Sequence, residues 1–176
     1  MERAELEREL ERLHAACWGW ALACCDRDRD AAEDTLQSAY LRILSGKARF
    51  DGRSSVRTWV FGVIRRTALE ERRRGITRRL REQTAPGNAI SDPAPGADLV
   101  VEHTEESAAL LTALETLSPR QREVLHLVFY QDMTIEEAAA VMQISLGSAR
   151  THYDRGKKAM ALALSTGRIH GREVAP

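Results

Sequence analysis

The sequence has no long apolar run and few cysteines. No stretch of about eighteen consecutive apolar residues occurs in its 176 residues, and the N-terminal segment MERAELERELERL is charged from its second residue. Neither a membrane-spanning helix nor a secretory signal peptide is therefore expected. The three cysteines, Cys17, Cys24 and Cys25, are an odd number in a chain without an export signal. This favours a reducing cytoplasm over a disulfide framework.

Short motifs that would carry catalysis are also missing. The sequence contains no G-x-x-x-x-G-K-[ST] phosphate loop, no H-E-x-x-H zinc motif and no G-x-S-x-G nucleophile elbow. We therefore expect no enzymatic activity, no cofactor and no bound metal.

His14 and the cysteines are the remaining candidates for a metal or redox site. Metal-ligand spacing of the C-x-x-C kind is missing, and a helical stripe explains two of the cysteines. Free cysteine is among the most buried residue types, so Cys17 and Cys24 are predicted to belong to the core. A redox or metal sensor that uses His14 and the cysteines remains an alternative. The stripe consists of Leu6, Leu10, Leu13, Cys17, Ala21 and Cys24.

Charge is unevenly distributed along the chain, although 26 basic and 26 acidic residues give no net charge. Residues 1–46 have a net charge of −4 and residues 117–176 a net charge of +2. Residues 47–81 carry twelve basic and three acidic side chains, whereas residues 82–116 carry seven acidic and no basic ones. Such a basic segment repels itself unless a polyanion is near, which indicates a nucleic-acid partner.

Between Glu82 and Glu106 the chain reads EQTAPGNAISDPAPGADLVVEHTEE, which has three of the five prolines and no sustained helical periodicity. Helical periodicity occurs on both sides of it, and no strand pattern appears in the N-terminal half. We predict an all-α protein of two small helical domains, residues 1–81 and 110–165. A flexible acidic linker, residues 82–109, joins them, and residues 166–176 form a tail.

In the first domain the long helix with the cysteine stripe is followed by a helix over about residues 30–44. Its inward side chains are predicted to be Leu36, Tyr40, Ile43 and Leu44. A second face carries Asp34, Gln37 and Leu41, and the apolar Leu41 there indicates a partner surface. The glycines of SGKARFDGRSS then predict a loop. The next helix, with Val56, Trp59, Val60 and Val63 inward, ends in an arginine run.

The second domain begins with two capping patterns. Ser118, Pro119 and Gln121 have the spacing of a capping box with proline at the first helical position, and Val124, Leu125 and Val128 are predicted to face inward. Thr134 and Glu137 repeat the capping spacing for a short helix that ends at Met142. After a tight turn at 143–145, a last helix runs through Leu164. Its predicted buried side consists of Ala149, Tyr153 and Met160.

Three helices with a short turn between the last two form a helix-turn-helix unit. The last helix would lie in the major groove of DNA, with donors suited to phosphates and base edges. An ordinary helical hairpin and a stand-alone helix-turn-helix regulator with an N-terminal dimerisation or sensor module are the alternatives. The donors are Ser148, Arg150, Thr151, His152, Arg155, Lys157 and Lys158.

Three segments, in this order, resemble regions 2 and 4 of the extracytoplasmic-function (ECF) sigma factors of bacterial RNA polymerase. They are AEDTLQSAYLRIL, RFDGRSSVRTWVFGVIRRTALEERRR and LSPRQREVLHLVFYQDMTIEEAAAVMQISLGSARTHYDRGKKAM. The resemblance implies a sigma-70 family factor that binds core polymerase through its clamp helices and flap and directs promoter recognition, melting and initiation at a stress- or signal-responsive set of genes. An anti-sigma protein is a candidate further partner, and the bacterial cytoplasm is the expected location.

Roles for individual residues follow from the same resemblance. Polymerase binding is assigned to Asp34, Gln37, Leu41 and Arg42, and minus-35 binding to the seven donors of the last helix. The loop from Lys47 to Ser55 would capture an extruded base of the minus-ten element, with Phe50 either against that base or anchored in the core. The full minus-ten set is Lys47, Arg49, Phe50, Arg53, Ser54, Ser55, Arg57, Arg65 and Arg66.

The chain departs from the family pattern at several of these positions. Ser38 stands where an acidic residue is usual, and Arg66 where asparagine is usual. His152 and Asp154 stand where arginine and histidine-like residues are common. The sequence therefore predicts no particular promoter preference.

Overall fold

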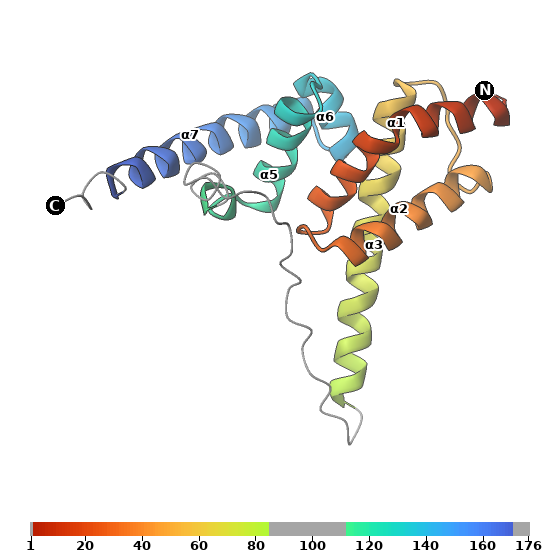
Figure 1. Ribbon diagram of the computed structural model, residues 1–176, viewed down its shortest axis with the longest axis horizontal. Coiled ribbons are helices and arrows are strands. Elements are labelled where there is room, and N and C mark those ends of the chain that lie inside the picture. Colours follow the sequence, from red (N-terminus) through yellow and green to blue (C-terminus); the bar gives the residue numbers. More distant parts are fainter. Residues whose placement is uncertain (1, 85–111, 171–176) are drawn as a thin grey trace. The chain divides into compact units, whose positions relative to one another are not determined.

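The structure is a computed structural model that describes residues 2–84 and 112–170, with side chains described for residues 2–77 and 112–165. All regular elements in these ranges are helices, so the predicted all-α class is confirmed (Figure 1). Two units, Met1–Ala97 and Asp98–Pro176, contain separate sets of contacts. No helix in the described ranges is long and apolar enough to cross a membrane. Most of the predicted linker, residues 85–109, lies outside the described residues.

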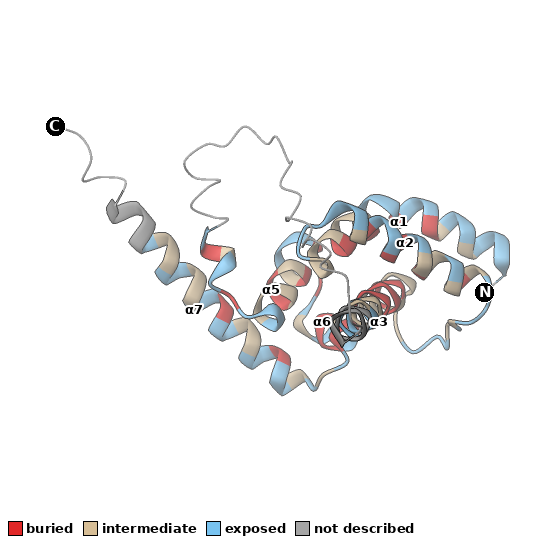
Figure 2. Cartoon of the chain, turned by 90° about the horizontal axis from the view of Figure 1, so that it is seen from below, coloured by how far each residue is buried: buried red, intermediate tan, exposed pale blue. Residues whose placement is uncertain are grey.

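The first unit is a bundle of three helices that all contact one another, α1 (Arg3–Cys24), α2 (Arg29–Leu44) and α3 (Val56–Thr84). Leu10, Leu13 and Cys17 of the predicted stripe are buried, whereas Leu6 and Cys24 are half-buried. The buried residues of each helix face its neighbours (Figure 2).

Trp20 is the large aromatic residue at the centre of this bundle. It is fully buried, its ring stacks on that of Phe61 at 6.0 Å, and its indole N–H donates to the Phe61 carbonyl over 3.0 Å. The hydrogen bond satisfies a polar group that would otherwise be costly to bury. Trp20 was not part of the predicted stripe, although it lies three residues after Cys17, a helical spacing.

The predicted inner face of α3 is correct in part. Val60 and Val63 are buried, but Val56 and Trp59 are only half-buried, and Phe61 and Ile64 are fully buried instead. The core face of α3 is therefore rotated relative to the prediction, because α3 packs against both α1 and α2 and buries a broader stripe than one partner helix would.

Helix α2 is capped by Asp28, whose carboxylate accepts from the Ala31 N–H over 3.0 Å. Leu36 and Ile43 are buried as predicted, while Tyr40 and Leu44 are half-buried. Small and polar residues occupy the rest of the inner face, since helix axes approach closely where side chains are short. These residues are Ala32, Thr35 and Ala39.

The second unit contains α5 (Pro119–Leu125), the π-helical turn η1 (His126–Tyr130), α6 (Ile135–Met142) and α7 (Leu146–His170). Both predicted capping boxes are confirmed. The Ser118 N–H donates to Gln121 Oε1 over 3.0 Å, and the Glu137 N–H donates to Thr134 Oγ1 over 3.1 Å.

The inner face of the second unit differs from the prediction after Leu125. Leu127 is fully buried and Val128 only half-buried, because the chain leaves α geometry at His126 and an extrapolated α-helical period no longer applies. On α7 Ala149 is buried as predicted, whereas Tyr153 and Met160 are half-buried. Helix α7 also extends past the predicted end to His170.

Candidate polymerase and nucleic-acid interfaces

The predicted polymerase-binding face of α2 is a surface of the first unit. Asp34, Gln37 and Leu41 are all exposed, and Leu41 keeps 63% of its surface accessible. Their spacing of three and four residues aligns them along one side of α2. An exposed apolar side chain beside polar ones, on a helix whose other side is buried, is the composition of a protein-binding surface.

Arg42, the fourth predicted polymerase contact, is held inside the first unit. Its guanidinium forms an ion pair with Glu70 of α3 over 2.7 Å, and only 26% of the Arg42 side chain is exposed. The hydrogen bond from Arg42 lowers the pKa of Glu70 below its ordinary value. Arg42 thus links α2 to α3 beside the exposed face formed by Asp34, Gln37 and Leu41.

The loop between α2 and α3 presents the basic residues predicted to contact the minus-ten element. Lys47, Arg49 and Arg53 are exposed, and Arg53 lies 3.5 Å from the Asp51 carboxylate. Gly46 and Gly52 have φ of 74° and 76°, a left-handed conformation that glycine adopts at little cost. The two glycines therefore set the path of the loop immediately before Lys47 and immediately before Arg53.

Phe50 packs against Trp59 at the base of this loop, with ring centroids 5.3 Å apart and planes tilted by 54°. Both residues are half-buried. Trp59 is therefore only partly in the core, although it was predicted to face inward. Phe50 has a ring that is packed on one side and partly accessible on the other. Such a ring can form one wall against a nucleobase.

Two residues of the predicted minus-ten set have internal roles. The Ser55 hydroxyl accepts from the Thr58 N–H over 3.1 Å and so caps α3. The Arg57 guanidinium lies over the Phe61 ring, 5.5 Å from its centroid, and Arg57 is half-buried. Ser54 and Arg65 are half-buried, and Arg66 is exposed.

Helix α7 of the second unit begins at a capped turn. The Ser145 hydroxyl accepts from the Ser148 N–H over 3.1 Å, and Gln143 closes α6 with φ of 55° in the left-handed region. Six of the seven predicted minus-35 residues are exposed, and His152 is half-buried. The helix-turn-helix prediction is thereby confirmed as local geometry.

These residues lie along two sides of α7. A spacing of three and four residues aligns Ser148, Thr151, Arg155 and Lys158 on one side. Arg150 and Lys157, seven residues apart, lie on another side with Tyr153, whose ring faces the Lys157 ammonium at 5.2 Å. Tyr153 also stacks on Phe129 at 5.9 Å.

The cysteines give little support to a redox or metal sensor. Cys17 is fully buried, and burial raises the pKa of its thiol to about 11. Burial also raises the pKa of Cys25. Protonated thiols are poor nucleophiles and poor metal ligands. Within the described residues no group of three or more His, Cys, Asp and Glu side chains could hold a metal.

Two family models match the chain in order. The model of sigma-70 region 2 matches residues 7–79, and that of sigma-70 region 4 matches residues 107–160. The first covers the bundle α1 to α3, and the second covers the helix-turn-helix through most of α7. The two matched segments together span more than half of the sequence.

Proteins of similar sequence are named RNA polymerase sigma factors. The RNA polymerase sigma factor CarQ of Myxococcus xanthus is 30% identical over 139 residues, 77% of this chain and 75% of CarQ. The ECF RNA polymerase sigma factor SigX of Bacillus subtilis is 29% identical over 143 residues, 76% of this chain and 71% of SigX.

Solved structures share the fold. The sigma factor RpoE of Bartonella quintana, solved with the anti-sigma factor NepR, has a TM-score of 0.68 at 22% identity, covering 92% of this chain and 97% of RpoE. CnrH, solved with the cytosolic domain of CnrY, has a TM-score of 0.58 at 20% identity, covering 94% of this chain and 90% of CnrH.

The chain belongs to the sigma-70 family of transcription initiation factors. Within that family it is a sigma factor of the extracytoplasmic-function group, and it directs transcription initiation. Two sigma regions in order disfavour the alternative of a stand-alone helix-turn-helix regulator.

Proposed function

We propose that this sigma factor binds core RNA polymerase through the face of α2 formed by Asp34, Gln37 and Leu41. The observation that carries this proposal is the exposed Leu41 in line with two exposed polar residues, on the side of α2 opposite its buried residues. Arg42 supports the same face through its ion pair with Glu70, which joins α2 to α3. The clamp helices of the polymerase are the expected partner in the first unit and the flap in the second.

The loop from Lys47 to Ser55 is proposed to hold the melted minus-ten element. Lys47, Arg49 and Arg53 are placed for backbone phosphates, while the pair of Phe50 and Trp59 offers a partly exposed aromatic surface to an extruded base. Flipping an unpaired base costs a few kcal/mol, and stacking with phosphate contacts returns a similar amount. Melting by this route needs no ATP.

Helix α7 is proposed to read the minus-35 element in the major groove. In helix-turn-helix docking the N-terminal residues of the recognition helix contact base edges and later ones contact the backbone. Arg150 lies in the first turns of α7, whereas Arg155 and Lys158 lie further along it.

The chain supplies binding energy and makes or breaks no bond itself, since the polymerase carries out the chemistry. Its proposed place of action is the bacterial cytoplasm, where polymerase and promoter DNA are found. An anti-sigma protein is a further proposed partner, because the similar structures of RpoE and CnrH were solved with NepR and with the cytosolic domain of CnrY.

A selection from a minus-35 library with holoenzyme, at two salt concentrations, tests the DNA half of the proposal. Arg155→Ala should weaken all sequences about equally and lower the salt slope by about one. Arg150→Ala should change the preferred sequence, by about 1–3 kcal/mol at one base pair if the contact is bidentate. His152→Ala should have a smaller effect, because this side chain is half-buried.

The selection also contains its own counter-test. If Arg155→Ala changed the preferred minus-35 sequence while Arg150→Ala kept the preference of the unaltered protein, α7 would enter the groove in another orientation. If no minus-35 preference emerged with unaltered holoenzyme, the proposed role of α7 would be wrong.

A further inference from the structure

Arg42 lies where α2, α3 and the loop between them meet. Its side chain pairs with Glu70 of α3 over 2.7 Å, and its backbone carbonyl accepts from the Ala48 N–H over 2.9 Å. Ala48 lies in the loop between Lys47 and Arg49, two of the exposed basic residues proposed to hold minus-ten phosphates. Arg42 thus connects the C-terminal end of α2 both to this loop and to α3.

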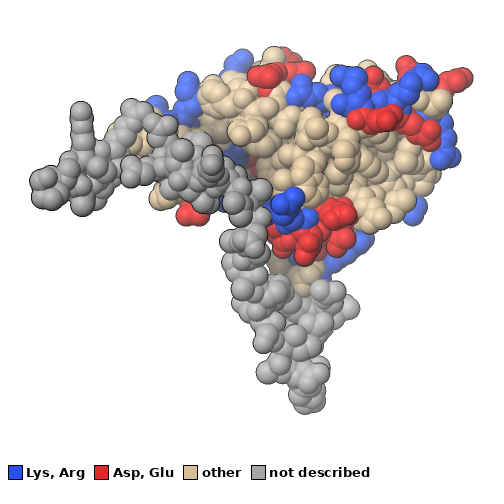
Figure 3. All heavy atoms as spheres, in the orientation of Figure 1, with Lys and Arg blue, Asp and Glu red and all other residues tan. Residues whose placement is uncertain are grey.

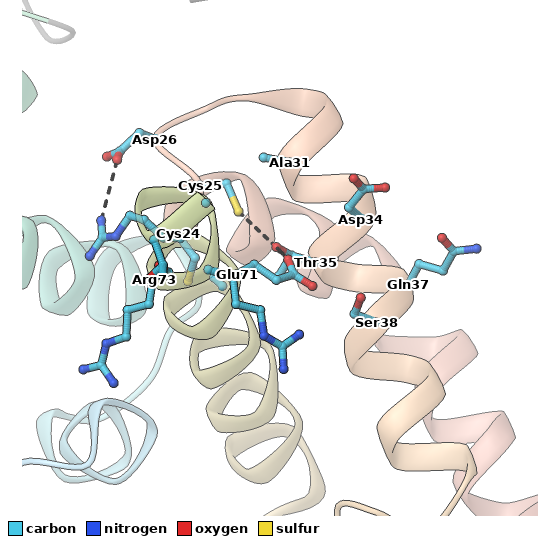
Figure 4. A pocket seen from close by; sticks show the side chains of 15 residues that line it. Cys24, Cys25, Asp26, Ala31, Asp34, Thr35, Gln37, Ser38, Glu71 and Arg73 are labelled. Atoms are coloured by element: carbon cyan, nitrogen blue, oxygen red, sulfur yellow. Dashed lines mark hydrogen bonds and ion pairs between the residues drawn. The ribbon is translucent and has the colours of Figure 1, made fainter. Parts of the chain in front are cut away.

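The proposed polymerase-binding face of α2 points in another direction. Figure 4 shows the side chains of Asp34 and Gln37 directed away from α3. Arg42, in contrast, reaches α3, and only 26% of its side chain is exposed. Although the family resemblance assigned Arg42 to polymerase binding, its side chain therefore belongs to the junction of α2 and α3.

Glu70, the partner of Arg42, also has arginines on its own helix as neighbours. Arg66 and Arg74 stand four residues before and four residues after it, on the same side of α3, and both are exposed. The hydrogen bond from Arg42 is the main cause of the lowered pKa of Glu70, and the positive charges of Arg74 and Arg66 lower it further. The carboxylate is therefore ionised and has cations from two helices within electrostatic reach.

The adjacent carboxylate, Glu71, has a partner that carries no charge. The hydroxyl of Thr35, a buried residue of α2, donates to Glu71 over 2.7 Å, and Figure 4 shows the two side chains next to each other. Glu71 is thus held in the interface between α2 and α3 without an arginine. Glu70 differs because it takes up the charge of an arginine.

We propose that Arg42 is a positioning residue for minus-ten binding, because by occupying Glu70 it leaves Arg66 and Arg74 for the phosphates of promoter DNA. The inference rests on the proposed function of the loop and of α3 in binding this DNA. Arg66 is the predicted minus-ten residue on this side of α3, at a position where asparagine is usual in the family. Arg74, roughly 12 Å further along the same side, is a new member of the phosphate-binding set.

Without the Arg42 side chain, the Glu70 carboxylate would turn to the arginines of its own helix. Residues four apart on a helix lie close enough for their side chains to form an ion pair. An arginine that is paired with Glu70 loses its contact with a phosphate, so fewer counterions are released when DNA binds. This side of α3 would then contribute one cation fewer to DNA binding.

The test measures binding of the full-length protein to fluorescein-labelled single-stranded DNA of mixed sequence, by fluorescence anisotropy at several salt concentrations. Arg42→Ala removes the side chain and keeps the backbone carbonyl that holds Ala48. This variant should bind severalfold more weakly, with a salt slope smaller by about 0.7, the contribution of one phosphate contact in single-stranded DNA. Arg42→Lys keeps a cation for Glu70 and should recover most of the loss.

Glu70→Gln separates a positioning role from a structural one. It removes the competing carboxylate, so it should bind DNA no more weakly than the unaltered protein. Adding it to Arg42→Ala should restore both the affinity and the salt slope. If the ion pair only stabilised the fold, both single variants would bind more weakly, and if Arg42 contacted DNA directly, Glu70→Gln would not rescue its loss. Either result would overturn the proposal.

The ion pair between Arg12 and Glu9 of α1 provides a control with the same changes in charge. It is also 2.7 Å long and partly exposed. Arg12→Ala should have little effect on DNA binding. Arg42→Ala combined with Glu9→Gln has the same net charge as Arg42→Ala combined with Glu70→Gln, but it should still bind weakly. Rescue by Glu9→Gln would mean that net charge alone controls binding, and the positioning role would be wrong.

Arg49→Ala, in the loop, tests the proposed function on which the inference rests. If Arg49→Ala weakens DNA binding and Arg42→Ala does not, the positioning role is wrong while the proposed minus-ten function stands. If neither weakens it, the minus-ten function of the first unit fails as well. Circular dichroism checks the fold of each variant. Should Arg42→Ala fail to fold, Glu70→Gln decides alone, because weaker DNA binding by that variant contradicts the proposal.

Discussion

Single residues of this sigma factor occupy backbone conformations that their side chains disfavour. Gln143, in the turn of the helix-turn-helix, has φ of 55°, a region that costs a residue with a Cβ about 1 kcal/mol or more. Glycine avoids this cost but gains freedom in the unfolded chain. Gln143→Gly should therefore raise the free energy of unfolding of the second unit by about 0.5–1 kcal/mol.

Urea titration of the full chain, followed by a probe in the second unit, measures this change. Ala161→Gly, at an exposed interior position of α7, is the matched control and should lower stability by about 1 kcal/mol. A loss of stability in both variants would show that Gln143 contributes contacts that outweigh its strained backbone.

The ion pair between Arg42 and Glu70 should contribute little to the stability of the first unit. Both side chains are partly exposed, 26% and 37%, so a coupling of only about 0.5–1 kcal/mol is expected from a double-mutant cycle with alanine. Exchanging the pair, Arg42→Glu with Glu70→Arg, should restore part of the stability that either single change removes. If polymerase binding is lost in the stable exchanged variant, Arg42 contacts the polymerase directly.

The pH dependence of this pair follows from the lowered pKa of Glu70. A carboxyl group whose pKa is depressed in the folded state stabilises the protein above its unfolded pKa, and this stability is lost as pH falls through the folded pKa. The pair should thus contribute fully at neutral pH and disappear below about pH 4.5, the unfolded value. Glu70→Gln should flatten this acidic part of the stability curve.

Helix packing in the second unit depends on a glycine. Gly156 of α7 is buried, and a Cβ built at this position would lie 3.0 Å from Leu125 Cδ1 on α5. Alanine would favour the helix by about 1 kcal/mol but would press on Leu125. Gly156→Ala should therefore fail to stabilise the native sequence, and it should be less unfavourable in a Leu125→Ala background, where the contact at 3.3 Å with Gln121 Cβ remains.

Thermal unfolding of the four proteins of this cycle provides the measurement. If the stability changes of Gly156→Ala and Leu125→Ala were additive, Leu125 would move aside without cost. The packing of α5 on α7 would then not depend on glycine at position 156.

The elements show which features the sequence can predict. Capping residues such as Ser118 and Thr134 act within one helical turn, so their spacing alone predicted both helix starts. The exposed face of α2 was likewise predicted by periodicity. Trp59 was predicted to face inward but is half-buried, and the burial of Trp20 was not predicted, because burial depends on the neighbouring helices as well as on spacing.

Non-local partners lie beyond what spacing can predict. The Arg42–Glu70 ion pair joins residues 28 positions apart, and the inward turn of Arg57 over Phe61 depends on how α3 packs in the bundle. Among the predicted minus-ten residues, the basic loop side chains are exposed as expected, whereas the Ser55 hydroxyl caps α3. Composition predicted the loop, but the structure was needed to separate exposed from internal side chains.

In the whole molecule, the predicted binding surfaces are distributed over two small units. The predicted polymerase and minus-ten surfaces belong to the first unit and the predicted minus-35 surface to the second. Each unit alone offers few contacts, and tethered binding becomes strong only when both engage at once. The chain should therefore bind core polymerase much more tightly than duplex promoter DNA alone.

The central claim is that the α2 face connects this chain to the polymerase. Its most direct test combines Asp34→Ala, Gln37→Ala and Leu41→Ala and measures core polymerase binding and promoter-specific run-off transcription. The control changes Glu5, Arg8 and Glu11 to alanine on α1, whose exposed surface mixes acidic and basic side chains (Figure 3).

Because all three α2 side chains are exposed, the triple variant should keep its helical circular dichroism and unfolding midpoint. It should lose polymerase binding and run-off transcript, while the α1 control retains both. A folded triple variant that binds polymerase and initiates transcription as well as the unaltered chain would contradict the account.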